Sequence, residues 1–321
     1  MISLLIPCFN ESEVLELTYE AIVREAKSWN EPIEILFVDD GSRDDTWDII
    51  HSLARRDGRV RGIRLSRNFG HQAAVGAGLE HAGGDAVVVL DADLQDPPRL
   101  IGEMLAKWRE GYEIVFAQRN CRKGESAFKK IAGNLFYRVL DKVNDVSIPR
   151  DTGDFALMDA SVVRHLAAFG EHALFWRGLR CWTGFKQASV RFDRPARAKG
   201  QSKYTLRKLA QLAGNGLLSF SSLPLRLALY LGGLTLCGTL LATFVSLAFF
   251  VVNPTAPWLV SAAVLAMFYL GSIQLLCLGV MGEYINRIYD EVRNRPRWLV
   301  RQSVGYQEDQ AQVPQPRRKA G

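Results

Sequence analysis

Two stretches of the chain, residues 227–252 and residues 258–281, contain no charged residue. Each is longer than the roughly 20 apolar residues that an α-helix needs to span about 30 Å of hydrocarbon. The short segment between them is uncharged and contains Pro254 and Pro257, which is typical of a tight turn. The sequence therefore predicts a two-helix transmembrane hairpin that follows a long N-terminal domain.

Lysine and arginine residues flank the two apolar stretches. They are Arg207, Lys208 and Arg226 before the pair, and Arg287, Arg293, Arg295, Arg297 and Arg301 after it. Basic flanks are retained on the cytoplasmic side, so the N-terminal domain and both termini are predicted to be cytoplasmic. The apolar run at the N-terminus is too short for a signal peptide. We expect a multi-pass protein of the inner (plasma) membrane.

The first 120 residues alternate between strand and helix patterns. Predicted strands cover residues 2–7, 33–39, 61–65, 86–90 and 113–118, and predicted helices cover residues 11–29, 45–56, 72–81 and 98–110. This alternation predicts an α/β domain with a doubly wound sheet. Polar clusters follow three of the strands, at residues 10–11, 39–42 and 91–93, and ligands of such sheets bind at the carboxyl ends of strands.

Asp91 and Asp93 follow the apolar run of residues 86–90, which is typical of a strand buried on both faces. Two carboxylates at this spacing can share a divalent cation, and their hard oxygen atoms suit Mg²⁺ or Mn²⁺. The motif alone is weak, because many such tripeptides are surface turns. Its place at a strand end favours the metal site.

The first strand-to-helix turn has the sequence PCFNES and lacks the glycines of nucleotide-binding loops. A bound diphosphate would therefore need a metal and basic side chains. Asp39 and Asp40 could accept hydrogen bonds from a base or ribose, or could instead cap the next helix. The net charge of +6 favours acidic partners, and the five cysteines show no zinc or disulfide spacing.

Five motifs, in this order, resemble the family 2 glycosyltransferases of GT-A fold: IPCFNE (6–11), VDDGSRDDT (38–46), LSRNFG (65–70), DADLQDPP (91–98) and DTGDF (151–155). GQSKY (200–204) and GEYINRIYDEVRNRP (282–296) resemble the polyisoprenyl-phosphate branch, which includes dolichol-phosphate mannose synthases and bacterial undecaprenyl-phosphate sugar transferases. The resemblance implies a GT-A mixed sheet, a nucleotide-sugar donor, Mg²⁺ or Mn²⁺, a polyisoprenyl phosphate acceptor, membrane lipids and a homo-oligomer. It implies no nucleic-acid partner.

The resemblance also assigns site residues. Those on the donor side are Pro7, Phe9, Glu11, Val38, Asp39, Asp40, Asp91, Ala92 and Arg119. Those around the metal and diphosphate are Asp91, Asp93 and Gln95, and the cationic phosphate-binding positions are Arg119, Arg197 and Lys203. Arginine and lysine suit phosphate oxygens, although a solvated basic face is the alternative interpretation.

Asp154 matches the family's candidate base. A phosphate monoester loses its second proton with a pKa of about 6, so a lipid phosphate needs little help from a base. We therefore expect Asp154 to act as a base or to position the acceptor. With Asp93, Arg197 and Lys203, it completes the predicted catalytic set.

The predicted domain layout is a cytosolic GT-A domain (1–205), an interfacial amphipathic segment (206–226), two transmembrane helices (227–252 and 258–281) and a basic cytosolic tail (282–321). Residues 128–140 form a second amphipathic stretch. Phe175, Trp176 and Trp182 are predicted to lie in the core rather than to stack on a sugar.

The predicted reaction is the inverting transfer of glucose from UDP-glucose to undecaprenyl phosphate. GDP-mannose and UDP-4-amino-arabinose derivatives stay open as donors. A processive polysaccharide synthase is a more distant alternative, because the Q-x-x-R-W motif is absent from the sequence. A non-catalytic membrane scaffold would have no need for this set of acidic and basic residues.

Overall fold

The computed structural model describes residues 1–120, 149, 152–169, 171, 175–193, 223–252, 258–293 and 295–306. Several predictions lie outside these residues, among them Arg197, Lys203, the 128–140 segment and residues 206–222 of the predicted 206–226 segment. The chain divides into two compact units, and residues 296–306 belong to the same unit as the N-terminal residues.

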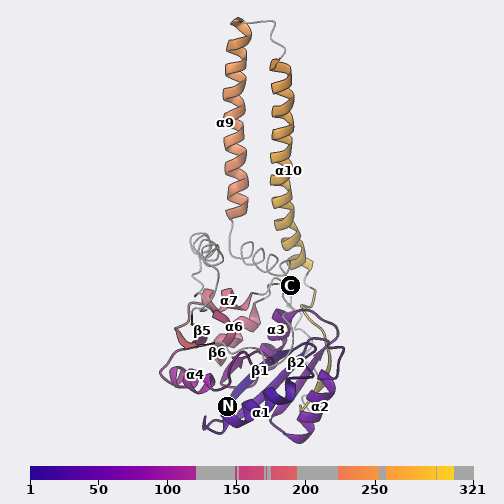
Figure 1. The fold of residues 1–321 in the computed structure, drawn as a ribbon, viewed down its shortest axis with the longest axis vertical. Helices are drawn as coiled ribbons and strands as arrows, with labels where there is room; N and C mark the ends of the chain where they lie inside the picture. Colours follow the sequence, from indigo (N-terminus) through magenta and orange to yellow (C-terminus); the bar gives the residue numbers. More distant parts are fainter. Residues whose placement is uncertain are drawn as a thin grey trace. The chain divides into compact units, whose positions relative to one another are not determined.

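The N-terminal unit is built around one sheet (Figure 1). Its strands are β1 Ile2–Cys8, β2 Ile33–Asp39, β3 Val60–Leu65, β4 Ala86–Val89, β5 Ile114–Arg119, β6 Thr152–Asp159, β7 Gln187–Phe192 and β8 Val300–Val304. Its helices are α1 Leu15–Ala26, α2 Thr46–Arg56, α3 His71–His81, α4 Leu100–Arg109, α6 Ala160–Ala168 and α7 Trp176–Trp182.

The sheet is mixed, in the order β7-β5-β6-β4-β1-β2-β3-β8. Strands β4, β1, β2 and β3 run parallel to one another, and β5 and β7 are a parallel pair. β6 runs antiparallel to both β4 and β5, and β8 runs antiparallel to β3. This arrangement confirms the predicted α/β mixed sheet of GT-A type.

Alternation along the buried strands divides the core between the two faces of the sheet. Ile35 and Phe37 of β2 pack with residues from α1, α2 and α4, whereas Leu36 and Val38 pack with α3 and Trp298. Successive side chains of a strand point to opposite faces, so a strand with apolar side chains on both faces requires cover on both faces of the sheet. The predicted helices supply that cover.

The predicted strand and helix positions in the first 120 residues agree with the structure to within a few residues at each end. Two differences concern the rest of the sheet. The antiparallel strand β6 separates β4 from β5, so the parallel order is interrupted. In addition, part of the predicted 282–321 tail forms β8, at the edge of the sheet beside β3.

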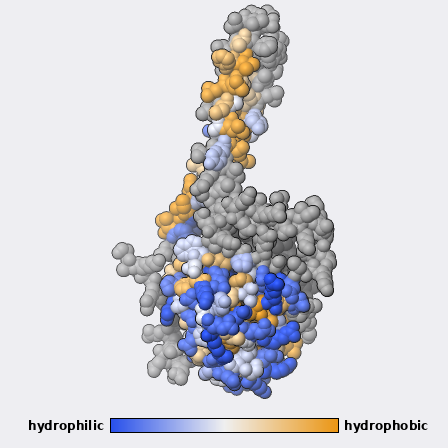
Figure 2. All heavy atoms as spheres, turned by 90° about the vertical axis from the view of Figure 1, so that its left-hand side faces the viewer, coloured by the Kyte–Doolittle hydropathy of each residue, from blue (hydrophilic) through white to orange (hydrophobic). Residues whose placement is uncertain are grey.

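The second unit contains two long helices, α9 Leu223–Val252 and α10 Trp258–Arg293. The Sγ atom of Cys277 in α10 lies 3.6 Å from the carbonyl oxygen of Ala228 in α9, so the helices contact each other. Many of their described apolar side chains are exposed, and Figure 2 shows hydrophobic atoms along them. Within the described residues, Ala266–Arg293 is long and apolar enough to cross a membrane, judged by length and composition.

Candidate active site

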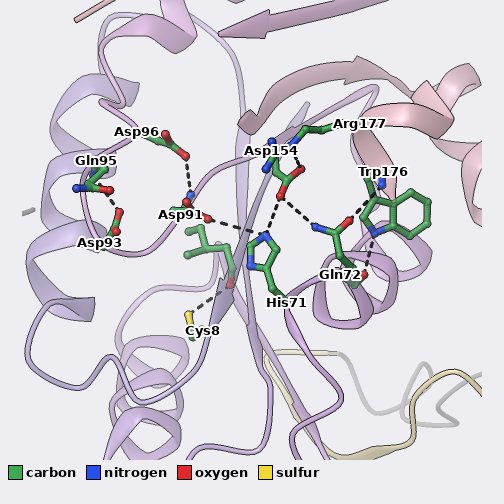
Figure 3. Close-up of polar contacts among 11 residues, drawn as sticks. Cys8, His71, Gln72, Asp91, Asp93, Gln95, Asp96, Asp154, Trp176 and Arg177 are labelled. Carbon is green, nitrogen blue, oxygen red and sulfur yellow. Dashed lines mark hydrogen bonds and ion pairs between the residues drawn. The ribbon is translucent and has the colours of Figure 1, made fainter. Parts of the chain in front are cut away.

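The topology brings distant acidic residues to one edge of the sheet. β4 ends at Val89, and the antiparallel partner of Val89 in β6 is Ala156. Because β6 runs in the opposite direction, the residues at its start lie at the edge where β4 ends. Asp154 and Asp91 therefore come together although they are far apart in the sequence (Figure 3).

Hydrogen bonds shape the loop after β4. The backbone N–H of Asp91 donates to Asp96 Oδ2 (3.1 Å), and that of Gln95 donates to Asp93 Oδ1 (3.0 Å). The buried hydroxyl of Thr18 donates to the carbonyl of Ala92 (2.6 Å). These bonds hold the segment between the two metal-binding candidates in a defined conformation.

Asp91 and Asp93 fit a divalent cation by their chemistry. Both offer hard carboxylate oxygens, and the Asp91 side chain remains 38% exposed at the end of its strand. No group of three or more possible ligand side chains occurs among the described residues. Mg²⁺ is commonly held by one or two carboxylates together with substrate phosphates. Asp91 and Asp93 would hold such an ion, with Gln95 beside them.

Asp39 and Asp40 are buried and bonded to neighbouring loops. Asp40 accepts the backbone N–H groups of Phe69 (2.7 Å) and Gly70 (2.9 Å), while Asp39 accepts that of Ser42 (2.8 Å) and pairs with Arg64. Burial raises the pKa of Asp40 to about 6, although both backbone bonds act in the opposite direction. These carboxylates organise the loops around the predicted nucleoside site.

The other predicted donor-side residues fall into two places. Pro7 and Val38 are buried at the ends of neighbouring strands, and the backbone N–H of Glu11 donates to Thr46 Oγ1 (2.9 Å). Arg119 lies at the end of β5, and its Nη2 is 3.2 Å from the position that a Cβ on Gly153 would occupy. Arg119 is thus close to the backbone next to Asp154.

Three side chains engage the Asp154 carboxylate. His71 Nε2 lies 3.2 Å from Oδ2, and Gln72 Nε2 donates to the same oxygen at 3.1 Å. Arg177 Nε donates to Oδ1 at 3.0 Å. His71 Nε2 also lies 4.0 Å from Asp91 Oδ1, so one imidazole contacts both carboxylates (Figure 3).

Asp154 is held in its ionised form. Burial by itself would raise its pKa, but the charge of Arg177 and the hydrogen bond from His71 keep the pKa well below the usual 3.8. For His71, burial by itself would lower the pKa, because it disfavours the charged imidazole. The bond to Asp154 and the charge of Asp91 outweigh this and raise the pKa of His71 to about 9. The ionised Asp154 is a weak base and a strong hydrogen-bond acceptor.

His71, Gln72 and Arg177 were not predicted as site residues. His71 directly follows the LSRNFG motif, and this position, after a predicted strand and loop, could have indicated a site residue. Arg177 belongs to none of the motifs. Trp176 is 4% exposed, which confirms its predicted core position, whereas Trp182 is 58% exposed and its predicted core position is wrong.

The chain belongs to glycosyl transferase family 2, whose family model matches residues 3–167. It is a glycosyltransferase. It is 44% identical over 306 residues to the uncharacterized glycosyltransferase YkcC of Bacillus subtilis, covering 94% of each chain. It is also 37% identical over 310 residues to the SfII prophage-derived bactoprenol glucosyl transferase of Shigella flexneri, covering 94% of this chain and 98% of that one.

The depressed pKa of Asp154 leads to a pH prediction. Its ionised contacts stabilise the fold fully above the unfolded pKa of about 3.9, and this contribution is lost as the pH falls through the lower folded pKa. We expect the melting-temperature difference between wild type and Asp154→Asn to be larger at pH 5 than at pH 7, because the stabilising protonation of His71 beside Asp154 is fully present only below the unfolded histidine pKa of about 6.5. The difference should then shrink below about pH 4 as Asp154 becomes protonated. A difference that already shrinks between pH 7 and pH 5 would contradict the depressed pKa.

Proposed function

We propose that the chain transfers glucose, with inversion, from UDP-glucose to undecaprenyl phosphate at the cytosolic face of the membrane. The observation that carries this proposal is that Asp91, on the loop after β4, and Asp154, at the start of β6, both lie beside the Nε2 atom of His71, at 4.0 Å and 3.2 Å. Relatives named bactoprenol glucosyl transferases support the acceptor and the sugar.

The donor would bind with its diphosphate beside Asp91 and Asp93. A divalent cation held there would neutralise the charge that develops on the nucleoside diphosphate as it leaves. The bond that Thr18 donates to Ala92 and the bond that Asp96 accepts from the N–H of Asp91 would keep the two carboxylates in place. Asp39 and Asp40 would shape the neighbouring nucleoside site through the loops that they hold.

The acceptor oxygen would attack the anomeric carbon directly, which inverts its configuration. A phosphate monoester is largely deprotonated at neutral pH, so this step needs little general-base catalysis. The ionised Asp154 suits a positioning role because its pKa lies well below neutrality. Arg177 and His71 offset its negative charge next to an anionic substrate.

The strand β8 supports the hairpin topology. β8 follows α10 in the sequence and pairs with β3 of the N-terminal unit, so chain segments on both sides of the two helices belong to one sheet. One folded sheet lies on one side of a membrane. The intervening chain must then cross an even number of times, and α9 and α10 would provide two crossings.

A reporter experiment tests this topology. A reporter inserted at Thr255, between the helices, should be accessible outside the cytoplasm, whereas one fused after Gly321 should be cytoplasmic. The reason is that the two helices return the chain to the side of β3. Cytoplasmic signals at both positions would contradict the two crossings.

Arg197 and Lys203 remain predicted phosphate ligands. Loss of one charge-assisted hydrogen bond to phosphate should reduce transition-state stabilisation by about 1.5 to 3 kcal/mol. This corresponds to a decrease in kcat/KM of roughly ten to more than a hundred-fold. The melting temperatures of Arg197→Ala and Lys203→Ala should stay close to that of the wild type. Lys199→Ala is the neighbouring control, and equal kinetic losses in all three variants would indicate general surface charge instead.

The proposed reaction is tested by UDP release from UDP-glucose with purified full-length protein. We expect release that requires both undecaprenyl phosphate and Mg²⁺ or Mn²⁺ and that stops with EDTA. With GDP-mannose as the donor under the same conditions, little GDP should be released. Release that is indifferent to the lipid phosphate would contradict the proposed acceptor, and faster turnover of GDP-mannose would contradict the donor.

A further inference from the structure

We infer that the first turn of α3 positions Asp154 for the acceptor phosphate, with His71 and Gln72 as the positioning residues. This inference rests on the proposed function and extends it to residues that the motifs do not assign. Both side chains reach the same carboxylate oxygen, at 3.2 Å and 3.1 Å. Arg177 holds the other oxygen from α7, so the carboxylate is fixed from two elements.

The orientation of the Gln72 amide is set by Trp176. Gln72 Oε1 accepts the backbone N–H of Trp176 (3.1 Å), which leaves its Nε2 to face Asp154. The indole N–H of Trp176 also donates to the backbone carbonyl of Gln72 (2.8 Å). In a flipped amide, Nε2 would face the N–H of Trp176 and Oε1 would face the carboxylate of Asp154, so both hydrogen bonds would be lost. The buried Trp176 therefore selects the orientation in which Nε2 donates to Asp154.

His71 links the donor and acceptor sides of the site. An ionised carboxylate only accepts hydrogen bonds, so the Nε2 atom that faces Asp154 carries a hydrogen. The same Nε2 lies 4.0 Å from Asp91 Oδ1. A single imidazole therefore keeps Asp154 in a defined place relative to Asp91, next to which the reacting sugar would lie.

The turn that carries these two residues is itself anchored. Asp40, which directly follows β2, accepts the N–H groups of Phe69 and Gly70 just before α3. Gly70 adopts a φ of +100°. Further along α3, a Cβ on Gly76 would lie only 2.7 Å from Trp298 and 3.0 Å from Trp176. Close packing at Gly76 and the loop bonds together fix the helix start, which is what a positioning element requires.

The experiment is a double-mutant cycle with UDP-glucose, undecaprenyl phosphate and Mn²⁺. His71→Ala should lower kcat about 10 to 100-fold, since a misplacement of about 1 Å can cost that much, with the KM for UDP-glucose within about threefold of wild type. His71→Gln should recover most of the loss, because its amide N–H can replace Nε2–H. In an Asp154→Ala background, His71→Ala should cost less than about twofold more, because residues that act as a unit are non-additive.

His81→Ala is the matched control, because His81 lies in the last turn of the same helix and bonds to the carbonyl of Ala77. Its kcat should match that of the wild type, while melting temperatures report any loss of fold. Multiplicative losses in the double variant, or a loss confined to the KM for UDP-glucose, would overturn the positioning role while the wild type still turns over. A wild type inactive with this donor and acceptor would overturn the proposed function and the inference together.

Discussion

Replacement of Asp93 by alanine is expected to lower turnover by about a thousand-fold or more. The variant lacks one of the two carboxylates that would hold the cation, and metal stabilisation of a leaving group is worth several kcal/mol, of which about 4 kcal/mol corresponds to a thousand-fold. In a calorimetric titration with UDP, Mn²⁺ should increase the affinity of the wild type for UDP and should leave the affinity of the variant unchanged.

Asp85→Ala is the control for this variant. Asp85 immediately precedes β4, whereas Asp93 lies in the loop that follows the same strand. Its side chain is 74% exposed and pairs with the N-terminal amine. Turnover should stay within about twofold of wild type, since exposed ion pairs contribute little. An Asp93→Ala protein that keeps half of its activity, or whose UDP affinity still depends on Mn²⁺, would show that the cation is held elsewhere.

Asp154→Asn is expected to lower kcat by two to three orders of magnitude. The asparagine has the same shape, but its amide nitrogen must face either Arg177 Nε or the pair of donors from His71 and Gln72. Donor then opposes donor, and two cationic side chains lose their anion. The side chain would rotate away from the geometry that positions the acceptor, and misplacement of a reacting group costs about 10²-fold or more.

Asp159→Asn provides a matched control on the same strand. Asp159 caps α6 through the N–H of Ser161, and its other carboxylate oxygen accepts the indole N–H of Trp108 (2.9 Å). Asparagine is an equally good N-cap residue but loses the Trp108 bond, so a lower melting temperature is expected without a loss of turnover. We expect kinetics close to wild type for this variant, measured by UDP release at saturating donor. If Asp154→Asn also stayed close to wild type, the carboxylate would be a structural group without a role in transfer.

The parallel part of the sheet was predictable because its strands are short, apolar and bounded by polar turns. Ile2–Cys8 and Ile33–Asp39 consist mostly of apolar residues, and both strands are buried along their whole length. Asp91 and Asp93 could be placed at a strand end for the same reason. The role of Asp154, by contrast, came from the resemblance of DTGDF to a family motif.

The contacts of Asp154 could not be predicted, because they depend on the direction of β6. Only an antiparallel β6 between β4 and β5 brings Asp154 to the edge that carries Asp91 and the start of α3. Nothing in the local sequence specifies that pairing. β8 was missed for a different reason: residues Val300–Val304 are a short edge strand with mostly exposed side chains and no buried hydrophobic run.

The structure of the lipid product reports directly on the proposed transfer. Full-length protein would be incubated with UDP-glucose labelled in the sugar, undecaprenyl phosphate and Mg²⁺, and the organic phase analysed by mass spectrometry and NMR. We expect one hexose joined to the lipid through a single phosphate, with the anomeric configuration opposite to that of the donor. A lipid diphosphate sugar, a retained configuration, or label only in free glucose would contradict it.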